Sequence, residues 1–261
     1  AHPGDDTTLE TTHGWEREGP WAGRIKQEAE NVRDNCGVLD LPGFSRFNLT
    51  GVGAAEYLRE LITGGLPKVG RMNLAYFSDT RGRILTEMSM VRHGEDHFTL
   101  ITAASAQWHD FDVLNARLPE SLVLTDDTTE FSTLVVTGPK ARDILTAMGT
   151  DADLTLGWLS HQTAKVAGQA CALLRVSFAG ELGWEIHAEN IKIPALYDSV
   201  IAAGAKPFGM YALNSLRIEK GYRAWKGDIS TDYSLFEGGL GRFVNLEKPQ
   251  DFPGKAALQN E

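Results

Sequence analysis

The chain is most apolar around one stretch, Val176-Ser177-Phe178-Ala179-Gly180-Glu181-Leu182-Gly183-Trp184-Glu185-Ile186-His187. An apolar run leads into a turn that holds two glycines and Glu181, and the chain returns through a second short apolar run around Glu185. This arrangement is typical of a β-hairpin. Carboxylates are rarely buried unless another group pairs with them, so both acids are candidate binding residues. Glu181 is more simply explained as a solvated turn residue, whereas Glu185 lies between Trp184 and Ile186 in the return strand.

Helical and strand patterns are mixed along the chain. Apolar residues recur every three or four positions in several segments, which predicts helices at 20–36, 54–62, 105–118, after 138–139, 193–203 and 211–221. Shorter alternating or apolar runs predict strands at 44–50, 73–78, 83–92, 97–102, 132–137, 158–166 and 172–178. Because these elements do not follow strict βαβ alternation, the sequence predicts an α+β fold.

The composition is that of an ordinary globular protein. The chain has 261 residues, 42% of them hydrophobic and 23% charged, which suits one large domain or two small ones. A formal net charge of -10 argues against a nucleic-acid or acidic-membrane surface, because both need clustered cations. No apolar run reaches the roughly 18 residues of a membrane span. We therefore expect neither a nucleic-acid partner nor a membrane partner.

Several motifs of other protein classes are absent from the sequence. It contains no glycine-rich dinucleotide or nucleotide motif and no nucleophile elbow. His93 and His97 are four positions apart but flank a turn, so we predict no metal site. Cys36 and Cys171 lie far apart in apolar surroundings, which favours two buried free thiols over a disulfide. Free thiols indicate a reducing compartment, the cytoplasm, or the mitochondrial matrix in a eukaryote.

Two further segments carry candidate chemistry. Alternation along Gly82–Met88 places Glu87 on the same strand face as apolar Leu85, although pattern alone favours an edge-strand acid over a functional one. A helix and a run rich in Tyr, Arg, Trp and Lys occupy 211–228. A carboxylate that accepts two parallel N–H bonds suits a planar amidine, either an arginine or a heterocycle such as a pterin, and neighbouring rings would stack on it. The pattern does not separate these two partners.

Two of these segments resemble a known family. Gly180-Glu181-Leu182-Gly183-Trp184-Glu185 and Tyr211-Ala212-Leu213-Asn214-Ser215-Leu216-Arg217-Ile218-Glu219-Lys220-Gly221 are similar to the folate-binding superfamily of the glycine-cleavage aminomethyltransferase. The similarity is closer to the tetrahydrofolate-binding C-terminal region of dimethylglycine and sarcosine dehydrogenases. Shorter matches occur at 36–41, 67–70, 136–139 and 251–255. The resemblance runs from about Trp15 to the end of the chain.

The resemblance implies a fold of two interleaved lobes, each a mixed or antiparallel sheet with helices. We expect a mobile lead-in over 1–14 and a folate-binding domain over 15–245. Within that domain, the first lobe should take about 15–50 and 130–205, and the second about 51–129 and 206–245. Residues 246–261 would begin a C-terminal segment whose barrel domain, present in relatives, is missing here.

The resemblance also implies a site. Tetrahydrofolate would lie between the lobes with its pterin edge on Glu185, and Glu87 would be catalytic, at a position where aminomethyltransferases carry an acid, usually Asp. Leu213 stands where aminomethyltransferases have a folate-binding Arg, which favours the dehydrogenase branch. The other residues that would contact the cofactor are Phe178, Trp184, Tyr211 and Arg242.

The implied function is tetrahydrofolate-dependent one-carbon transfer. A formaldehyde-level carbon from a methylated amine or aminomethyl donor would be captured as 5,10-methylenetetrahydrofolate. The resemblance also implies a FAD dehydrogenase domain or subunit as a partner. One alternative is an O- or S-demethylase that passes a methyl group to tetrahydrofolate. The other is a non-enzymatic folate-binding or iron–sulfur maintenance module. Such modules carry a Lys-Gly-Cys-Tyr signature. This chain has Lys226-Gly227-Asp228 at that place and so lacks the cysteine of the signature.

Overall fold

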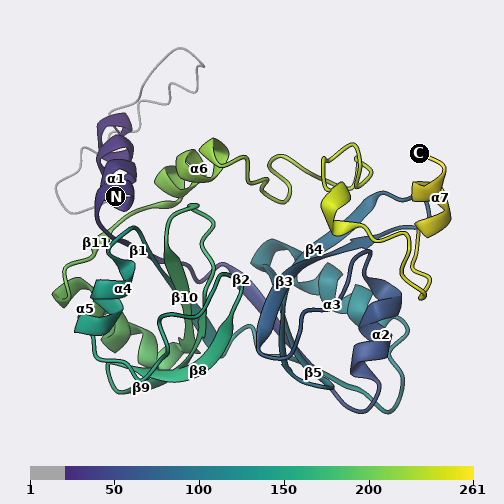
Figure 1. Ribbon diagram of the computed structural model, residues 1–261, viewed down its shortest axis with the longest axis horizontal. Coiled ribbons are helices and arrows are strands. Elements are labelled where there is room, and N and C mark those ends of the chain that lie inside the picture. Colours follow the sequence, from purple (N-terminus) through teal and green to yellow (C-terminus); the bar gives the residue numbers. More distant parts are fainter. Residues whose placement is uncertain (1–20) are drawn as a thin grey trace.

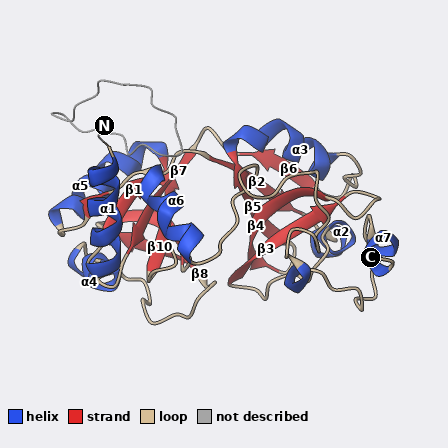
Figure 2. Ribbon diagram, turned by 90° about the horizontal axis from the view of Figure 1, so that it is seen from above, coloured by secondary structure: helices blue, strands red, loops and turns tan. Residues whose placement is uncertain are grey.

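The computed structural model describes residues 21–261, so the lead-in expected over 1–14 lies outside the described part of the chain. Two β-sheets lie side by side, each with its own helices, and a C-terminal segment runs from the first lobe across to the second (Figure 1). Seen from above, the helices gather around the outer sides of the two sheets, with α6 over the first sheet (Figure 2). The predicted α+β class is confirmed.

The first sheet has six strands in the order β11-β1-β7-β10-β9-β8. Strand β11 is parallel to β1, and the other pairs are antiparallel. One face packs on α4 and α5 through a large apolar cluster, and the other is partly covered by α1 and α6. The elements of this lobe are α1 (Ala22–Asp34), β1 (Gly37–Asp40), β7 (Phe131–Thr137), α4 (Ala141–Ala147), β8 (His161–Val166), β9 (Gln169–Leu174), β10 (Gly183–Glu189), α5 (Ile193–Ala202), β11 (Lys206–Pro207) and α6 (Met210–Glu219).

The second sheet has five antiparallel strands in the order β3-β4-β5-β2-β6. Its outer face packs on α2 and α3, and the C-terminal segment packs against β3 and β4. Its elements are β2 (Phe44–Thr50), α2 (Ala54–Leu61), β3 (Arg71–Ser78), β4 (Ile84–Gly94), β5 (His97–Ala103), α3 (Gln107–Asn115), β6 (Val123–Asp126) and the terminal α7 (Lys255–Gln259). Short 3-10 helices are η1 (Ala104–Ala106), η2 (Asn190–Lys192) and η3 (Gly241–Phe243).

The inner faces of the two sheets meet at a small apolar core. Met72, Val91 and Ile101 of the second sheet pack with Leu174 of the first, and all four are buried. The backbone joins the lobes as well: Met72 N–H donates to the Leu159 carbonyl at 2.9 Å, and His161 N–H donates to the Gly70 carbonyl at 3.1 Å. Each buried aliphatic side chain adds about 1.5–3 kcal/mol, so this contact holds the inner faces opposite each other.

Two lobe boundaries differ from those expected. Strand β2, assigned above to the first lobe, pairs with β5 and β6 and therefore belongs to the second sheet. Helix α6, assigned to the second lobe, packs Leu213 and Leu216 against the first sheet. The local patterns identified both elements correctly, but the choice of sheet depends on partners far away in the sequence.

Two smaller differences concern element ends. Strand β9 ends at Leu174, so Phe178 lies in the following turn and not in the strand. Helix α3 begins at Gln107 after the short helix η1, without a side-chain cap from Ser105.

No helix in residues 21–261 is long and apolar enough to cross a membrane.

Candidate functional site

Strand β10 presents different side chains on its two faces. Trp184 and Ile186 point into the apolar cluster under α4 and α5, and Trp184 is only 1% exposed. Glu185 and His187 point to the opposite, inner face, because successive side chains of a strand alternate. Trp184 therefore lies in the core of the first lobe, away from the face that carries Glu185.

Glu185 has a side-chain partner two residues along its own strand. His187 Nε2 lies 3.0 Å from Glu185 Oε2, and His187 Nδ1 lies 3.0 Å from the Thr133 hydroxyl. Thr133 is the direct cross-strand neighbour of His187 on β7. The Glu185 side chain keeps 14% of its surface exposed, whereas that of His187 keeps 3%. Glu185 is thus an oriented carboxylate that a ligand can still reach.

The turn that carries Phe178 is fixed by the end of α6. The Phe178 ring is 37% exposed and stacks on Tyr222, with centroids 6.1 Å apart, and the Arg217 guanidinium lies 5.8 Å from its centre. Gly180 has φ +77°, and a Cβ there would collide with the stem of Lys220. The turn therefore needs glycine for both its conformation and its close contact with α6.

Arg217 connects this turn to the segment that crosses between the lobes. Its guanidinium pairs with the Asp228 carboxylate and donates to the Tyr222 carbonyl at 2.8 Å. The hydrogen bond from the Ala224 backbone N–H, followed by the contact with Arg217, holds the pKa of Asp228 below its usual range. Arg217, one of the charged residues of α6, is therefore packed and paired and is not simply solvated.

Glu87 lies on the inner face of the second sheet, directly opposite Tyr76 on β3. Burial raises the pKa of the Glu87 carboxyl, and the nearby Asp110 carboxylate adds to this, while the hydrogen bond from Tyr76 opposes it. Asp110 is fully buried and accepts from the Thr102 hydroxyl at 2.6 Å. Glu87 is therefore a partly buried carboxyl that holds its proton to a higher pH than an exposed glutamate.

Two aromatic rings, those of Phe243 and Tyr76, lie between the Arg242 guanidinium and Glu87. Tyr76 packs on Phe243, with centroids 4.9 Å apart, and the exposed Arg242 guanidinium lies 4.7 Å above the same Phe243 ring. The structure thus brings Glu87, Tyr76 and Arg242 together on the second lobe. Glu185 belongs to the facing sheet of the first lobe.

Tyr211 is separated from the other candidates. Its ring is 74% exposed and stacks on Trp21 at 5.9 Å, on the outward face of α6. Leu213 is on the opposite face of the helix, 3% exposed, in the core between α6 and the first sheet. Tyr211 therefore lies at the α1–α6 surface in this structure.

Sequence reasoning missed His187, Tyr76 and Tyr222. The first had a signal, since strand alternation places residues 185 and 187 on one face. The other two had none, because their contacts depend on the pairing of β3 with β4 and on the path of the chain after α6.

A histidine cluster lies where the lobes meet. His93 of β4 contacts His97 and, across the interface, His161 of β8, with ring centroids 4.6 and 4.5 Å apart. Burial, followed by the neighbouring His161, His97 and Arg46, lowers the pKa of His93 to about 3. Burial and Arg46 also lower the pKa of His161. The lowered pKa values keep the His93 and His161 rings neutral. Within residues 21–261, no group of three or more His, Cys, Asp or Glu has the arrangement of a metal site.

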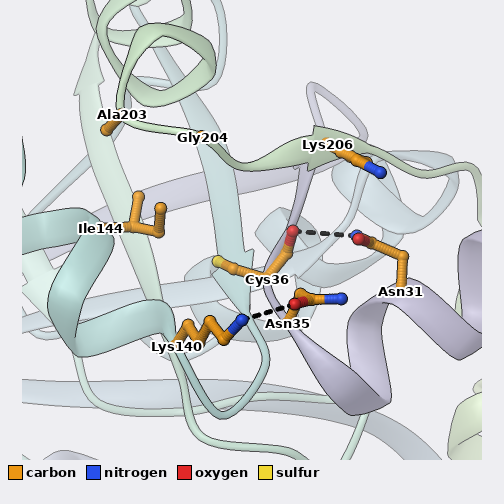
Figure 3. Close-up of a pocket in the computed structure, with 8 residues that line it drawn as sticks. All are labelled: Asn31, Asn35, Cys36, Lys140, Ile144, Ala203, Gly204 and Lys206. Carbon is orange, nitrogen blue, oxygen red and sulfur yellow. Dashed lines mark hydrogen bonds between the residues drawn. The ribbon is translucent and has the colours of Figure 1, made fainter.

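A partly open pocket of about 290 Å³ lies elsewhere, in the first lobe (Figure 3). Asn31, Asn35, Lys140 and Lys206 are among the residues that line it, and Lys140 Nζ donates to Asn35 Oδ1 at 2.7 Å. None of the candidate residues from the sequence lines this cavity.

Known proteins match this chain over most of its length. Residues 2–248 match the family described as the GCVT N-terminal domain. Mitochondrial dimethylglycine dehydrogenase of Rattus norvegicus is 32% identical over 98% of this chain, which spans 31% of that protein. The aminomethyltransferase of Listeria innocua is 28% identical over 94% of this chain and 68% of its own length. The crystal structure of the glycine cleavage system aminomethyltransferase T of Bartonella henselae shares the fold, with a TM-score of 0.83 and 24% identity over 90% of this chain and 65% of its own.

Proposed function

Because this chain belongs to the family of the GCVT N-terminal domain, we propose that it binds tetrahydrofolate between its sheets and transfers a one-carbon unit to it. The placement of Glu185 carries the proposal. Its carboxylate faces the second lobe, remains 14% exposed and is oriented by His187. A carboxylate of this kind accepts two parallel N–H bonds from the planar edge of a pterin.

The surrounding residues fit the remainder of such a ligand. The partly exposed Phe178 ring, supported from behind by Tyr222, offers a flat apolar surface beside the turn. The exposed Arg242 cation on the second lobe suits the carboxylates of a glutamyl tail. Trp184 makes no such contact from its place in the core, so its contribution is to hold β10 in position.

Glu87 is the residue we propose for the chemical step. Tetrahydrofolate supplies the nitrogen atoms that accept the carbon. Because burial raises the pKa of Glu87, its carboxyl can hold or release a proton closer to neutral pH than an exposed glutamate can. When ionised, the same group stabilises positive charge that develops on the transferred carbon.

The donor we propose is a methylated amine or an aminomethyl group, and the product is 5,10-methylenetetrahydrofolate. The similarity to a protein named dimethylglycine dehydrogenase supports this choice over an O- or S-methyl donor. It also supports a FAD-dependent dehydrogenase domain or subunit as the partner, whose FAD would take two electrons from a methylated amine and so bring its carbon to the formaldehyde level before transfer. An O- or S-demethylase would instead form 5-methyltetrahydrofolate, so product analysis distinguishes the two.

Calorimetry with tetrahydrofolate tests the proposal. Glu185→Gln should weaken binding by about tenfold or more, because hydrogen bonds to a charged group are worth about 1.5–3 kcal/mol. Glu189→Gln is the matched control, since Glu189 lies on the same strand with a side chain that is 53% exposed and paired with Lys192. Wild-type affinity in Glu185→Gln would remove Glu185 from the binding site.

A further inference from the structure

Glu185, His187 and Thr133 form one hydrogen-bond chain on the inner face of the first sheet. The two links, Glu185 Oε2 to His187 Nε2 and His187 Nδ1 to Thr133 Oγ1, are both 3.0 Å. Strand geometry fixes the order of the chain, because Glu185 and His187 are two residues apart on β10 and Thr133 is directly opposite His187 on β7.

The chemistry of the carboxylate determines which nitrogen carries the proton. An ionised carboxylate can only accept hydrogen bonds, so His187 Nε2 must carry the hydrogen that it shares with Glu185. In the neutral imidazole, Nδ1 is then an acceptor, and the Thr133 hydroxyl donates to it. Both supporting residues are buried, since the exposed fraction of the whole residue is 2% for Thr133 and 4% for His187. Water therefore does not compete for these hydrogen bonds.

We propose that His187 is a positioning residue that orients the Glu185 carboxylate for a planar pair of N–H donors, and that Thr133 fixes the imidazole tautomer. This inference rests on the proposed binding of tetrahydrofolate at Glu185. His187 occupies one lone pair of Oε2 and leaves one on that atom and two on Oε1, so both oxygens can still accept from a ligand. Without His187, the carboxylate would lose its fixed orientation, and the ligand would have to order it on binding.

Two amide substitutions separate positioning from a purely structural role. The amide nitrogen of Gln reaches about as far as Nε2 of histidine, whereas that of Asn reaches about as far as Nδ1. His187→Gln therefore keeps a donor for Glu185, and His187→Asn keeps a polar group only near Thr133. We expect His187→Gln to bind tetrahydrofolate nearly as well as wild type and His187→Asn to bind about tenfold more weakly.

Two further measurements complete the test. Histidine-selective ¹⁵N NMR of the free protein should show His187 protonated at Nε2, with a shift of that signal when tetrahydrofolate is added. In Glu185→Gln, the change from His187→Gln to His187→Asn should no longer alter affinity, because the oriented carboxylate is gone. Thermal denaturation of each variant verifies that it is folded.

The outcomes separate the two proposals. If Glu185→Gln itself binds normally, the proposed function fails at this site. If Glu185→Gln weakens binding while His187→Gln and His187→Asn have equal affinities, the positioning role is wrong and the folate site stands. A His187 protonated at Nδ1 would overturn the assigned tautomer. Should His187→Asn not fold, Thr133→Val decides in its place, since unchanged affinity and an unchanged ¹⁵N signal would contradict the chain.

Discussion

Tyr76 on β3 and Glu87 on β4 lie directly opposite each other on neighbouring strands, and the Tyr76 hydroxyl lowers the pKa of the Glu87 carboxyl. This contact favours the ionised form of Glu87, whereas burial and Asp110 favour the protonated form. The protonation of Glu87 is therefore set by groups from β3 and α3 as well as by its own strand.

Replacing Glu87 should separate binding from turnover. Glu87→Gln keeps the size of the side chain and removes its proton chemistry, so we expect unchanged tetrahydrofolate affinity and a loss of turnover of about 10²-fold or more. Single-turnover formation of methylenetetrahydrofolate measures the effect. Glu95→Gln is the control, because Glu95 follows β4 in a turn with a side chain that is 80% exposed. Full activity in Glu87→Gln would exclude Glu87 from the mechanism.

Removing the Tyr76 hydroxyl should move the pH dependence of the reaction. The hydrogen bond from Tyr76 lowers the pKa of Glu87, so Tyr76→Phe should raise that pKa further. The limb of the pH–rate profile that reports Glu87 is therefore expected at higher pH in Tyr76→Phe than in wild type. A profile that coincides with that of wild type would show that the bond does not tune the reacting group.

The histidine cluster should make the fold sensitive to acid. The ordinary pKa of His93 is 6.5, and in the folded protein it is lowered to about 3. Between these values the unfolded chain binds a proton that the folded chain does not, so stability falls as the pH drops from about 6.5 towards 3. Urea unfolding at pH 7.5 and pH 5 should show this loss, and His93→Gln should reduce it. An equal loss of stability in His93→Gln would contradict this prediction.

Trp184 provides a test of the two faces of β10. Because its side chain is buried on the face opposite Glu185, Trp184→Phe should keep tetrahydrofolate affinity. Its free energy of unfolding should fall, by less than the about 3–5 kcal/mol of a truncation to Ala. Phe178→Ala should show the reverse pattern, with weaker binding and a smaller loss of stability. Calorimetry and urea unfolding on both variants check the contrast, which fails if Trp184→Phe is the weaker binder.

The two cysteines should be unreactive in the folded protein. Both are buried free thiols, and burial raises the pKa of Cys36 to about 12 and that of Cys171 to about 11. The reactive thiolate is therefore scarce at neutral pH. A thiol reagent should modify neither cysteine until the protein is unfolded in guanidinium, and rapid modification under native conditions would contradict this burial.

Much of the architecture could be read from local patterns. The apolar run, the glycine turn and the return strand at 176–187 predict the hairpin. The expectation that Trp184 contacts the cofactor together with Glu185 overlooked strand alternation, which places the two side chains on opposite faces. The helices at α1, α2, α5 and α6 follow from their 3.6-residue periodicity. The family resemblance identified Glu87 and Glu185, two residues whose carboxyls the structure places on the facing sides of the two sheets.

Tertiary structure decided which distant segments meet. It placed β2 in the second sheet and α6 on the first, put Tyr76 opposite Glu87, and gathered His93 and His161 from separate lobes. It also buried the Trp184 side chain in the core and placed His187 in hydrogen-bonding contact with Glu185. Periodicity in a sequence encodes the kind of element and its two faces. The choice of strand partner, and of the face that is buried beneath helices, depends on packing energy summed over the whole chain.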